Sequence, residues 1–299
     1  MIESEIFIPD YIDQCLTEAD WQARQKHHQQ EIAAVVDPYL QKKQHQYKDP
    51  VLDFLFDYYA FRPSHLKRWS PGMGVLLENA NRQSAPSISE LTVTDEGAYL
   101  NPVHFPENRK SSARWILSLL KKSLEKDPSF GCFGMHEWAM VYKADSVRHN
   151  QLPLRMSKNK LNQFVESRPL LCTHFDAFRF FTAPAKPMNK FKVSRDAFAE
   201  TEQPGCLHTN MDLYKWAFKL FPWIGSETIR KTFFLAVDTR RLDMKASPYD
   251  LRDRGLQPIK IETKEGRLEY AKLQKEIYRR SLPIREQLIE EYKRLVHHF

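Results

Sequence analysis

The stretch PGCLHTNMDLYKWAFKLFPWIGSETIRKTFFLAVDTRRLDM, residues 204–244, decides the fold class of this 299-residue chain. Its first half predicts a helix that begins around Asn210, and Ser226 is placed to cap a second helix that runs to Met244. Two helices in direct succession favour a mostly helical domain.

Helical patterns also dominate both ends of the chain. Thr17 and Asp20 form a capping box for a helix that reaches about Gln46, which Pro38 should bend or break. A long helix over 264–299 should kink at Pro283. Further helices are expected over 49–62, capped by Asp49, over 111–127, and over 157–167, capped by Ser157.

Strand patterns are short and scattered. They are expected at VLLE, ending at Glu78, and within 89–94, 97–101, 152–156, 170–181 and 256–263. The helix at 157–167 between two of these segments gives a βαβ-like passage. We therefore predict a mostly helical α+β fold with a small central sheet, in a single domain over 1–299. It would comprise a helical N-terminal extension (1–48), a mixed core with the candidate site (49–263) and a long kinked C-terminal helix (264–299).

The composition indicates a globular protein with an anionic partner. Hydrophobic residues make up 42% of the chain and aromatic residues 12%, which is enough for a sizeable core. The formal charge of +7 favours nucleic acid as a partner. No apolar run approaches the roughly 20 residues that span a bilayer, and the start lacks the pattern of a signal peptide. We expect a cytoplasmic protein without membrane contact.

The four cysteines, Cys15, Cys132, Cys172 and Cys206, are far apart and show no CxxC spacing. Neither a disulfide framework nor a zinc finger is indicated, so reduced thiols are expected.

Four polar clusters lie among aromatic residues between 131 and 251. They are His136 with Glu137, His174 with Asp176, His208 with Asn210 and Asp212, and Tyr249 with Asp250. Imidazole and carboxylate groups beside dense apolar sequence are typical of active sites. We predict that these clusters meet at one aromatic-walled hollow. On the strand expected at 170–181, His174 and Asp176 would share a face, roughly 6.5 to 7 Å apart.

Cleavage of a glycosidic bond is the first chemistry that fits this collection. A carboxylate would stabilise positive charge on the sugar and orient water, while aromatic rings hold the departing base. Asp176 is the first candidate carboxylate and Glu137 the second. The predicted catalytic residues are Asp176, Glu137, His174 and Asp212. The predicted substrate-binding residues are Trp138, Phe178, Phe180, Tyr214, His208, Asn210 and Tyr249.

A divalent-metal enzyme acting on a small molecule or nucleotide is the alternative. His136, His174, His208 and Asp176 are ligand types that suit Zn, Fe or Mn. The HExxH signature is absent because Met140 stands where its second histidine should be. GxGxxG, Walker and GxSxG motifs are absent as well. A non-catalytic nucleic-acid-binding module stays open as a third possibility.

Four strings carry a family resemblance, namely GCFGMHEWAMVY (131–142), CTHFDAFRFF (172–181), QPGCLHTNMDLYKWAFKL (203–220) and ASPYDL (246–251). They resemble a bacterial family labelled 3-methyladenine DNA glycosylase. The similarity extends over nearly the whole chain. It implies a DNA-repair enzyme that excises an alkylated purine from DNA without a required cofactor, and it assigns no catalytic residue. Contacts to the DNA backbone are expected near Arg62, Lys67, Arg68, Arg109, Lys110, Lys121 and Lys122.

Overall fold

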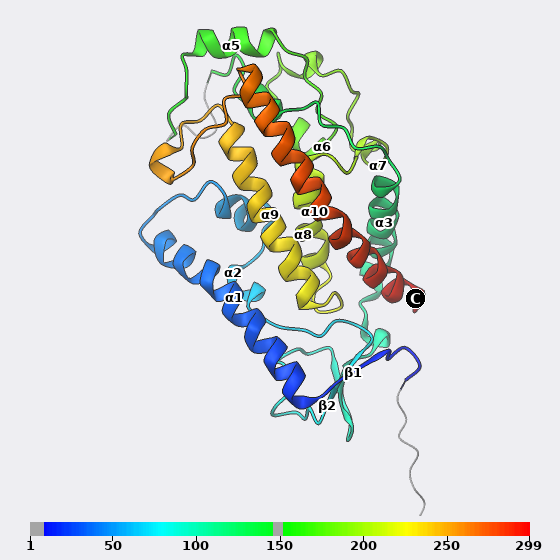
Figure 1. The fold of residues 1–299 in the computed structure, drawn as a ribbon. Coiled ribbons are helices and arrows are strands. Elements are labelled where there is room, and N and C mark those ends of the chain that lie inside the picture. Colours follow the sequence, from blue (N-terminus) through cyan, green and yellow to red (C-terminus); the bar gives the residue numbers. More distant parts are fainter. Residues whose placement is uncertain (1–8, 146–151) are drawn as a thin grey trace, which may run out of the picture.

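The computed structural model describes residues 9–145 and 152–299. The first eight residues of the predicted N-terminal extension therefore lie outside the described part. The mostly helical α+β class is confirmed, since helices accompany a single four-stranded sheet in the described chain. The helices do not enclose this sheet, because Figure 1 shows it at one end of them, beside the start of α1 (Glu18–Gln44).

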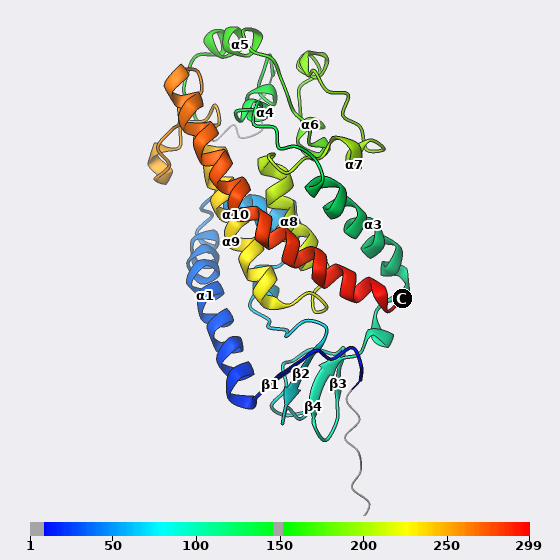
Figure 2. The same cartoon turned by 45° about the vertical axis from the view of Figure 1, so that its right-hand side comes forward.

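Helix α8 (Leu207–Lys219) is the central element. Eleven of its thirteen residues are buried, and it lies beside α9 (Ser226–Ala246) and α10 (Lys264–His297) in both ribbon views (Figures 1 and 2). A helix covered on nearly all sides is core rather than surface. Its polar residues therefore need partners inside the protein.

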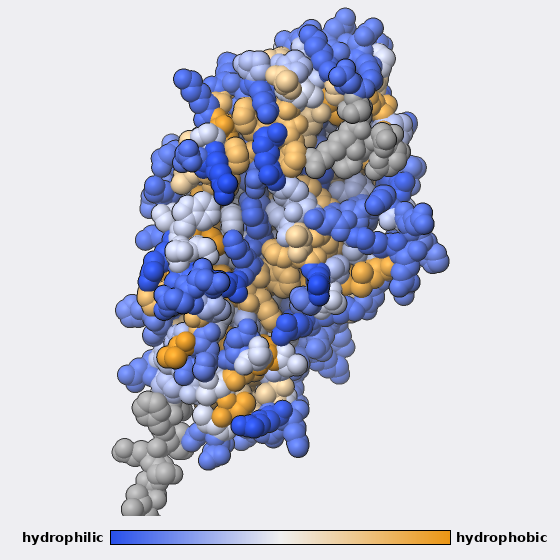
Figure 3. Space-filling view, turned by 180° about the vertical axis from the view of Figure 1, so that it is seen from behind, coloured by the Kyte–Doolittle hydropathy of each residue, from blue (hydrophilic) through white to orange (hydrophobic). Residues whose placement is uncertain are grey.

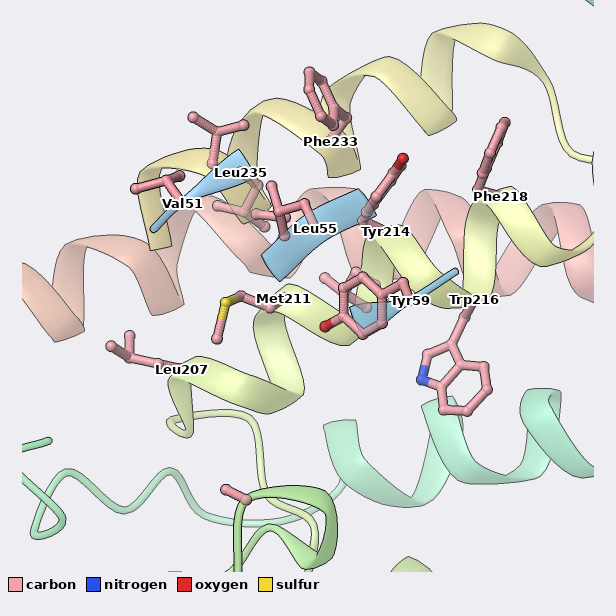
Figure 4. Close-up of a cluster of buried hydrophobic side chains, with 14 of the residues drawn as sticks. Val51, Leu55, Tyr59, Leu207, Met211, Tyr214, Trp216, Phe218, Phe233 and Leu235 are labelled. Carbon is pink, nitrogen blue, oxygen red and sulfur yellow. The ribbon is translucent and has the colours of Figure 1, made fainter. Parts of the chain in front are cut away.

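Aromatic and aliphatic side chains from three segments pack around α8 (Figure 4). Tyr214 of α8 contacts Phe233 of α9 and also Tyr59 of the segment that carries Leu55 and Tyr59. That segment is a π-helical turn, η1 (Phe54–Tyr58), where we predicted an ordinary helix. The turn projects adjacent aromatic residues in different directions, and this shapes the site described below.

The two terminal helices follow the sequence prediction. The predicted Thr17 cap is present, since its hydroxyl accepts a hydrogen bond from the Asp20 amide, and the hydroxyl also donates one to the Asp20 carboxylate. Both helices continue through their prolines, Pro38 in α1 and Pro283 in α10. Helix α9 begins one residue earlier than predicted, because Gly225 is at the N-cap position and Ser226, the predicted cap, is inside the helix.

Shorter helices complete the fold. In chain order they are α2 (Pro63–Leu66), η2 (Pro102–His104), α3 (Glu107–Leu124), α4 (Met135–Ala139), α5 (Lys158–Glu166), α6 (Phe175–Phe178), η3 (Lys186–Met188), α7 (Phe198–Thr201) and η4 (Arg252–Arg254). The predicted Ser157 cap of α5 is confirmed, because its side chain accepts from the Lys160 amide.

The sheet has the strand order β1-β2-β4-β3. Its strands are β1 (Gln14–Leu16), β2 (Val75–Glu78), β3 (Leu91–Val93) and β4 (Gly97–Leu100), with β1 parallel to β2 and the other pairs antiparallel. The last three strands were predicted and β1 was not. Gly97 has φ near 149°, and a Cβ there would overlap the Leu77 carbonyl, so the close β2–β4 approach needs glycine.

Three predicted strands are wrong. Residues 152–156 and 170–181 contribute only the isolated bridges Leu154–Tyr249 and Leu170–Asn189, and 256–263 forms no strand. The βαβ-like passage is therefore absent from the described chain. Within 170–181 the helical turn α6 replaces the strand, because Phe175, Phe178 and Phe181 recur every three residues as well as fitting an aromatic strand.

No helix within residues 9–145 or 152–299 has both the length and the apolar character needed to cross a membrane.

Candidate active site

A cavity of about 600 Å³ opens between η1, α4, α6, α8 and α9. Figure 3 shows the face turned away in Figure 1, which is hollowed near its middle with apolar patches between hydrophilic side chains. The volume falls within the range of about 300–1,000 Å³ usual for small-molecule sites. Its lining includes carboxylates, imidazoles and aromatic rings, namely Asp49, Asp53, Phe54, Asp57, Tyr58, Tyr59, Glu137, His174, Asp176, Phe180, His208 and Asp212, together with Lys48, Arg179 and Arg240.

Asp176 stands half-buried in the first turn of α6. Its carboxylate lies 3.1 Å from the Lys215 ammonium and 3.4 Å from Arg179 Nε. Burial alone would raise the pKa of Asp176, but Lys215 and Arg179 more than offset this effect and hold it below the usual value. The carboxylate is therefore ionised at neutral pH.

Asp212, on the buried face of α8, is held from three directions. Tyr59 donates a hydrogen bond of 2.7 Å to one carboxylate oxygen, and Lys215 lies 3.2 Å from the other. His174 Nε2 lies 4.0 Å from that second oxygen. Lys215 thus joins the two carboxylates, Asp176 and Asp212, on one wall of the cavity.

His174 is also in contact with a buried carboxylate behind the wall. Its Nδ1 lies 2.7 Å from Glu202 Oε1, and both side chains are almost fully buried. Burial would lower the pKa of His174, but Glu202 and Asp212 outweigh it and raise the pKa above its usual value. The imidazole therefore tends to carry a proton.

A second group of charges begins at Glu137 and Arg240 in the cavity wall and continues behind it to Asp243 and His136, which do not line the cavity. Arg240 Nη1 bonds Glu137 at 2.7 Å and Asp243 at 2.5 Å, and Asp243 also contacts His136 Nε2 at 2.7 Å. Burial would lower the pKa of His136, but Asp243 raises it well above the usual value. All four side chains are buried, so this group is a closed network of two cations and two carboxylates.

His208 lies between the two groups. Its ring stacks on His174 with centroids 5.1 Å apart and meets His136 edge-on at 4.5 Å. Burial and the neighbouring His136 lower the pKa of His208 well below its usual value. At neutral pH this imidazole is neutral while it faces the cavity.

Aromatic rings form the remaining wall. Phe54 and Tyr58 stack with centroids 4.7 Å apart, and Phe180 meets Tyr58 edge-on at 6.0 Å. The π-helical turn η1 makes the first pair possible by placing these two residues on one side. Such walls accept flat ligands.

The predicted convergence of four clusters is present only in part, because His136, Asn210 and the fourth cluster, Tyr249 with Asp250, do not line the cavity. Asp176, Glu137, His174, Asp212, His208 and Phe180 all line the cavity. They meet on helical elements and not on a strand, so the predicted shared strand face of His174 and Asp176 is wrong. The other predicted binding residues, Trp138, Phe178, Tyr214, Asn210 and Tyr249, do not line it.

These five residues have packing or structural contacts instead. Trp138 is core and donates to the Ala246 carbonyl, and Tyr214 packs against Phe218 and Phe233. Asn210 is fully buried and bonded to Arg285. Phe178 is half-buried and packs against Phe181, and Tyr249 is buried and forms an isolated β-bridge with Leu154.

Sequence reasoning missed five residues that hold the site together, which are Tyr59, Glu202, Lys215, Arg240 and Asp243. A signal existed for two of them. Arg240 and Asp243 continue the buried stripe of Phe233 and Ala236 at spacings of four and three residues. Charged residues on an apolar helix stripe indicate a buried ion-pair network.

The seven basic residues predicted to contact a DNA backbone do not line the cavity. Several have other partners, since Lys67 pairs with Asp37, Lys110 with Glu107 and Lys122 with Glu200. Lys48 and Arg179 are the exposed cations that do line it.

Two groups in the described chain have ligand atoms close enough for a metal ion. They are His136, His208 and Asp243, and His174, Asp176 and Asp212, with the atoms of each group within 4.8 Å of one another. The set predicted for the metal alternative is thus divided between two places. Each group also has a cation in contact, Arg240 in the first and Lys215 in the second.

No family model, curated protein or solved structure matches this chain. The family resemblance drawn from the sequence stays a prediction.

Proposed function

We propose that the protein is a hydrolase that cleaves the N-glycosidic bond of an alkylated purine in DNA, with the base held in the cavity. The observation that carries this proposal is Asp176, a carboxylate that Lys215 and Arg179 keep ionised at the wall of an aromatic-lined cavity. An ionised carboxylate stabilises the positive charge that develops on the sugar during cleavage.

The charge of the lining supports an alkylated base. Six carboxylates line the cavity (Asp49, Asp53, Asp57, Glu137, Asp176 and Asp212) against three permanent cations (Lys48, Arg179 and Arg240). Alkylation at N3 or N7 of a purine that is still bonded to its sugar gives the base a positive charge. The rings of this cavity already hold cations over their faces, since Arg240 lies 4.3 Å from the Phe54 centroid and Arg179 lies 4.7 Å from the Phe180 centroid. A cationic flat base would be attracted to the same rings in the same way.

The protonation states suit the same reaction. A cationic base leaves as a neutral molecule, so no acid has to protonate it. What the reaction needs is a stabilising carboxylate, which Asp176 supplies, and a group that accepts a proton from the attacking water. His208 is neutral and faces the cavity, so it can accept that proton. Glu137 is held by Arg240 and has a positioning role in this scheme.

Release of free base from alkylated duplex DNA tests the proposal. We expect release by the wild type and a loss of about 10² to 10³-fold in Asp176→Asn. Asp253→Asn is the matched control, because Asp253 is exposed, pairs with Arg254 and does not line the cavity. Its rate should stay within about threefold. Wild-type protein that binds the DNA and releases no base would refute the enzymatic proposal.

A metal-dependent enzyme is the second candidate, favoured by the two groups of closely spaced ligand atoms. It ranks second because Arg240 and Lys215 already balance the carboxylates that an ion would require. Elemental analysis of protein purified without chelator separates the two. Stoichiometric Zn, Fe or Mn that is lost on His208→Ala would favour the metal enzyme, and protein free of metal would favour the first proposal.

A further inference from the structure

Cys132, His136 and Asp243 form a line of three residues joined by two contacts. Cys132 Sγ lies 3.4 Å from His136 Nδ1, and the other ring nitrogen of His136 lies 2.7 Å from Asp243 Oδ1. A thiol beside an imidazole that a buried carboxylate orients is the arrangement that activates cysteine nucleophiles. The glycosidic reaction proposed above does not use this thiol.

The thiol faces its own small chamber behind the His136 and His208 side chains. The chamber has a volume of about 10 Å³, which is room for one water-sized molecule. Cys172 and Cys206 line it as well, so three of the four cysteines of the chain meet there from separate segments. Polar side chains of Gln203 and Gln274 complete the wall.

The three thiols differ in their surroundings. Cys172 is buried with its Sγ directed at the His174 carbonyl, and burial raises its pKa well above the usual value. Cys206 is half-buried in the fold and has a pKa raised to about 12, mainly through desolvation. Cys132 alone among them has an imidazole contact within the described chain, and it is half-buried rather than sealed.

We propose that Cys132 is a peroxide-reactive thiol activated by His136 and Asp243. The sulfur attacks one oxygen of hydrogen peroxide, the O–O bond breaks and a sulfenic acid forms on Cys132. The leaving hydroxide takes the proton held by His136 and departs as water, so sulfur is oxidised and the peroxide reduced. A second thiol of the chamber then condenses with the sulfenic acid, forming a disulfide and releasing water.

The size of the chamber limits which oxidants and electrophiles can reach Cys132. So small a space excludes bulky electrophiles, and hydrogen peroxide, which is one oxygen atom larger than water, is among the smallest two-electron oxidants. Peroxide is therefore the oxidant that reaches Cys132, although its side chain is less exposed than that of Cys15.

Cys15 is an internal control because it is an exposed thiol in the same molecule with no imidazole contact in the described chain. The folded wild type is treated with hydrogen peroxide at pH 7 for increasing times, then quenched, denatured and alkylated. Mass spectrometry of the peptides then gives the fraction oxidised at each cysteine. Denaturing before alkylation removes any effect of access to the alkylating reagent.

We expect Cys132 to be oxidised at least about tenfold faster than Cys15, and His136→Gln to remove that advantage. Equal or slower oxidation of Cys132 in the wild type would overturn the proposal, whether or not the variant folds. Retention of the full advantage in a folded His136→Gln protein would also overturn it. This comparison requires no glycosylase activity, so it stands or fails separately from the proposed function.

Discussion

Removal of the Arg240 guanidinium should strongly destabilise the protein. Arg240 is 4% exposed, and its Nη1 atom contacts Glu137 at 2.7 Å and Asp243 at 2.5 Å. In Arg240→Met both carboxylates stay buried and lose this shared cation, while Asp243 keeps only His136. Breaking a buried ion pair from one side costs about 3–5 kcal/mol in the free energy of unfolding. That loss is a large fraction of the total stability of a typical domain.

The loss of unfolding free energy in Arg240→Met should depend on pH, and the direction of this dependence can be predicted. Arg240 contributes to the low pKa of Asp243, so the variant raises the pKa of that carboxyl. A group with a depressed folded pKa stabilises the fold above its unfolded pKa and loses this contribution as the pH falls through the folded value. Both pH 5 and pH 7.5 lie above the ordinary pKa of an aspartate, about 3.9, so the wild type keeps this contribution at both. In the variant, burial raises the pKa of Asp243, and protonation of this carboxyl relieves part of the cost as the pH falls, so the deficit should be smaller at pH 5 than at pH 7.5.

Urea unfolding followed by circular dichroism at pH 5 and pH 7.5 measures both effects. Arg241→Met is the matched control, since Arg241 is the next residue of α9, is 56% exposed and lies 3.7 Å from Asp238. Its effect should be below about 0.5 kcal/mol. An Arg240→Met deficit under about 1 kcal/mol, or one that grows on acidification, would refute the ion-pair account of this group of charges.

Three further predictions concern stability. His136→Gln should lower the free energy of unfolding, measured with urea, by more at pH 6 than at pH 9. The raised pKa of His136 in the folded protein gives stability that is lost as the pH rises through that value. An equal loss at both pH values would contradict the pairing with Asp243. Tyr59→Phe should cost about 1.5 kcal/mol by removing the hydrogen bond to Asp212, and a neutral effect would argue against that bond. Gly266→Ala should cost at least about 2 kcal/mol, because its Cβ would overlap the Lys260 carbonyl. The control Gly131→Ala, whose Cβ meets only the end of the Leu171 side chain at 2.9 Å, should cost below about 1 kcal/mol, and similar melting temperatures for both would contradict the close approach.

Local signals in the sequence predicted much of the fold. The Thr17 and Ser157 caps, the long C-terminal helix and the three strands β2, β3 and β4 all follow from caps, turn residues and periodicity. These signals act within a few residues, so a single sequence carries them.

The segment 170–181 shows where such signals fail. Phe175, Phe178 and Phe181 fit a helical spacing, while the alternation of polar and apolar residues fits a strand. Short apolar runs do not distinguish the two periods. The choice depends on packing against other elements, as when the rings of Phe175 and Phe198 meet at 6.5 Å.

The candidate site could be predicted only in part, because its arrangement also depends on packing between distant segments. Its histidines and acids stand out because each lies within an apolar run. Lys215 looks like ordinary helix surface in the sequence, whereas Arg240 stands on an apolar helix stripe. Only the tertiary arrangement shows that each of them joins two carboxylates. Which aromatic residues face the cavity also depends on the tertiary arrangement, so Phe180 was placed correctly and Trp138 was not.

The central claim is that the cavity binds a cationic alkylated purine between aromatic rings and carboxylates. Isothermal titration of the wild type with 7-methylguanosine and with guanosine, under conditions where the methylated base is cationic, tests it most directly. We predict binding about tenfold tighter for the methylated nucleoside, consistent with cation–π contacts of roughly 0.5–2 kcal/mol, and a loss of this preference in Phe54→Leu. Equal affinity for the two nucleosides, or no binding of either, would contradict the account.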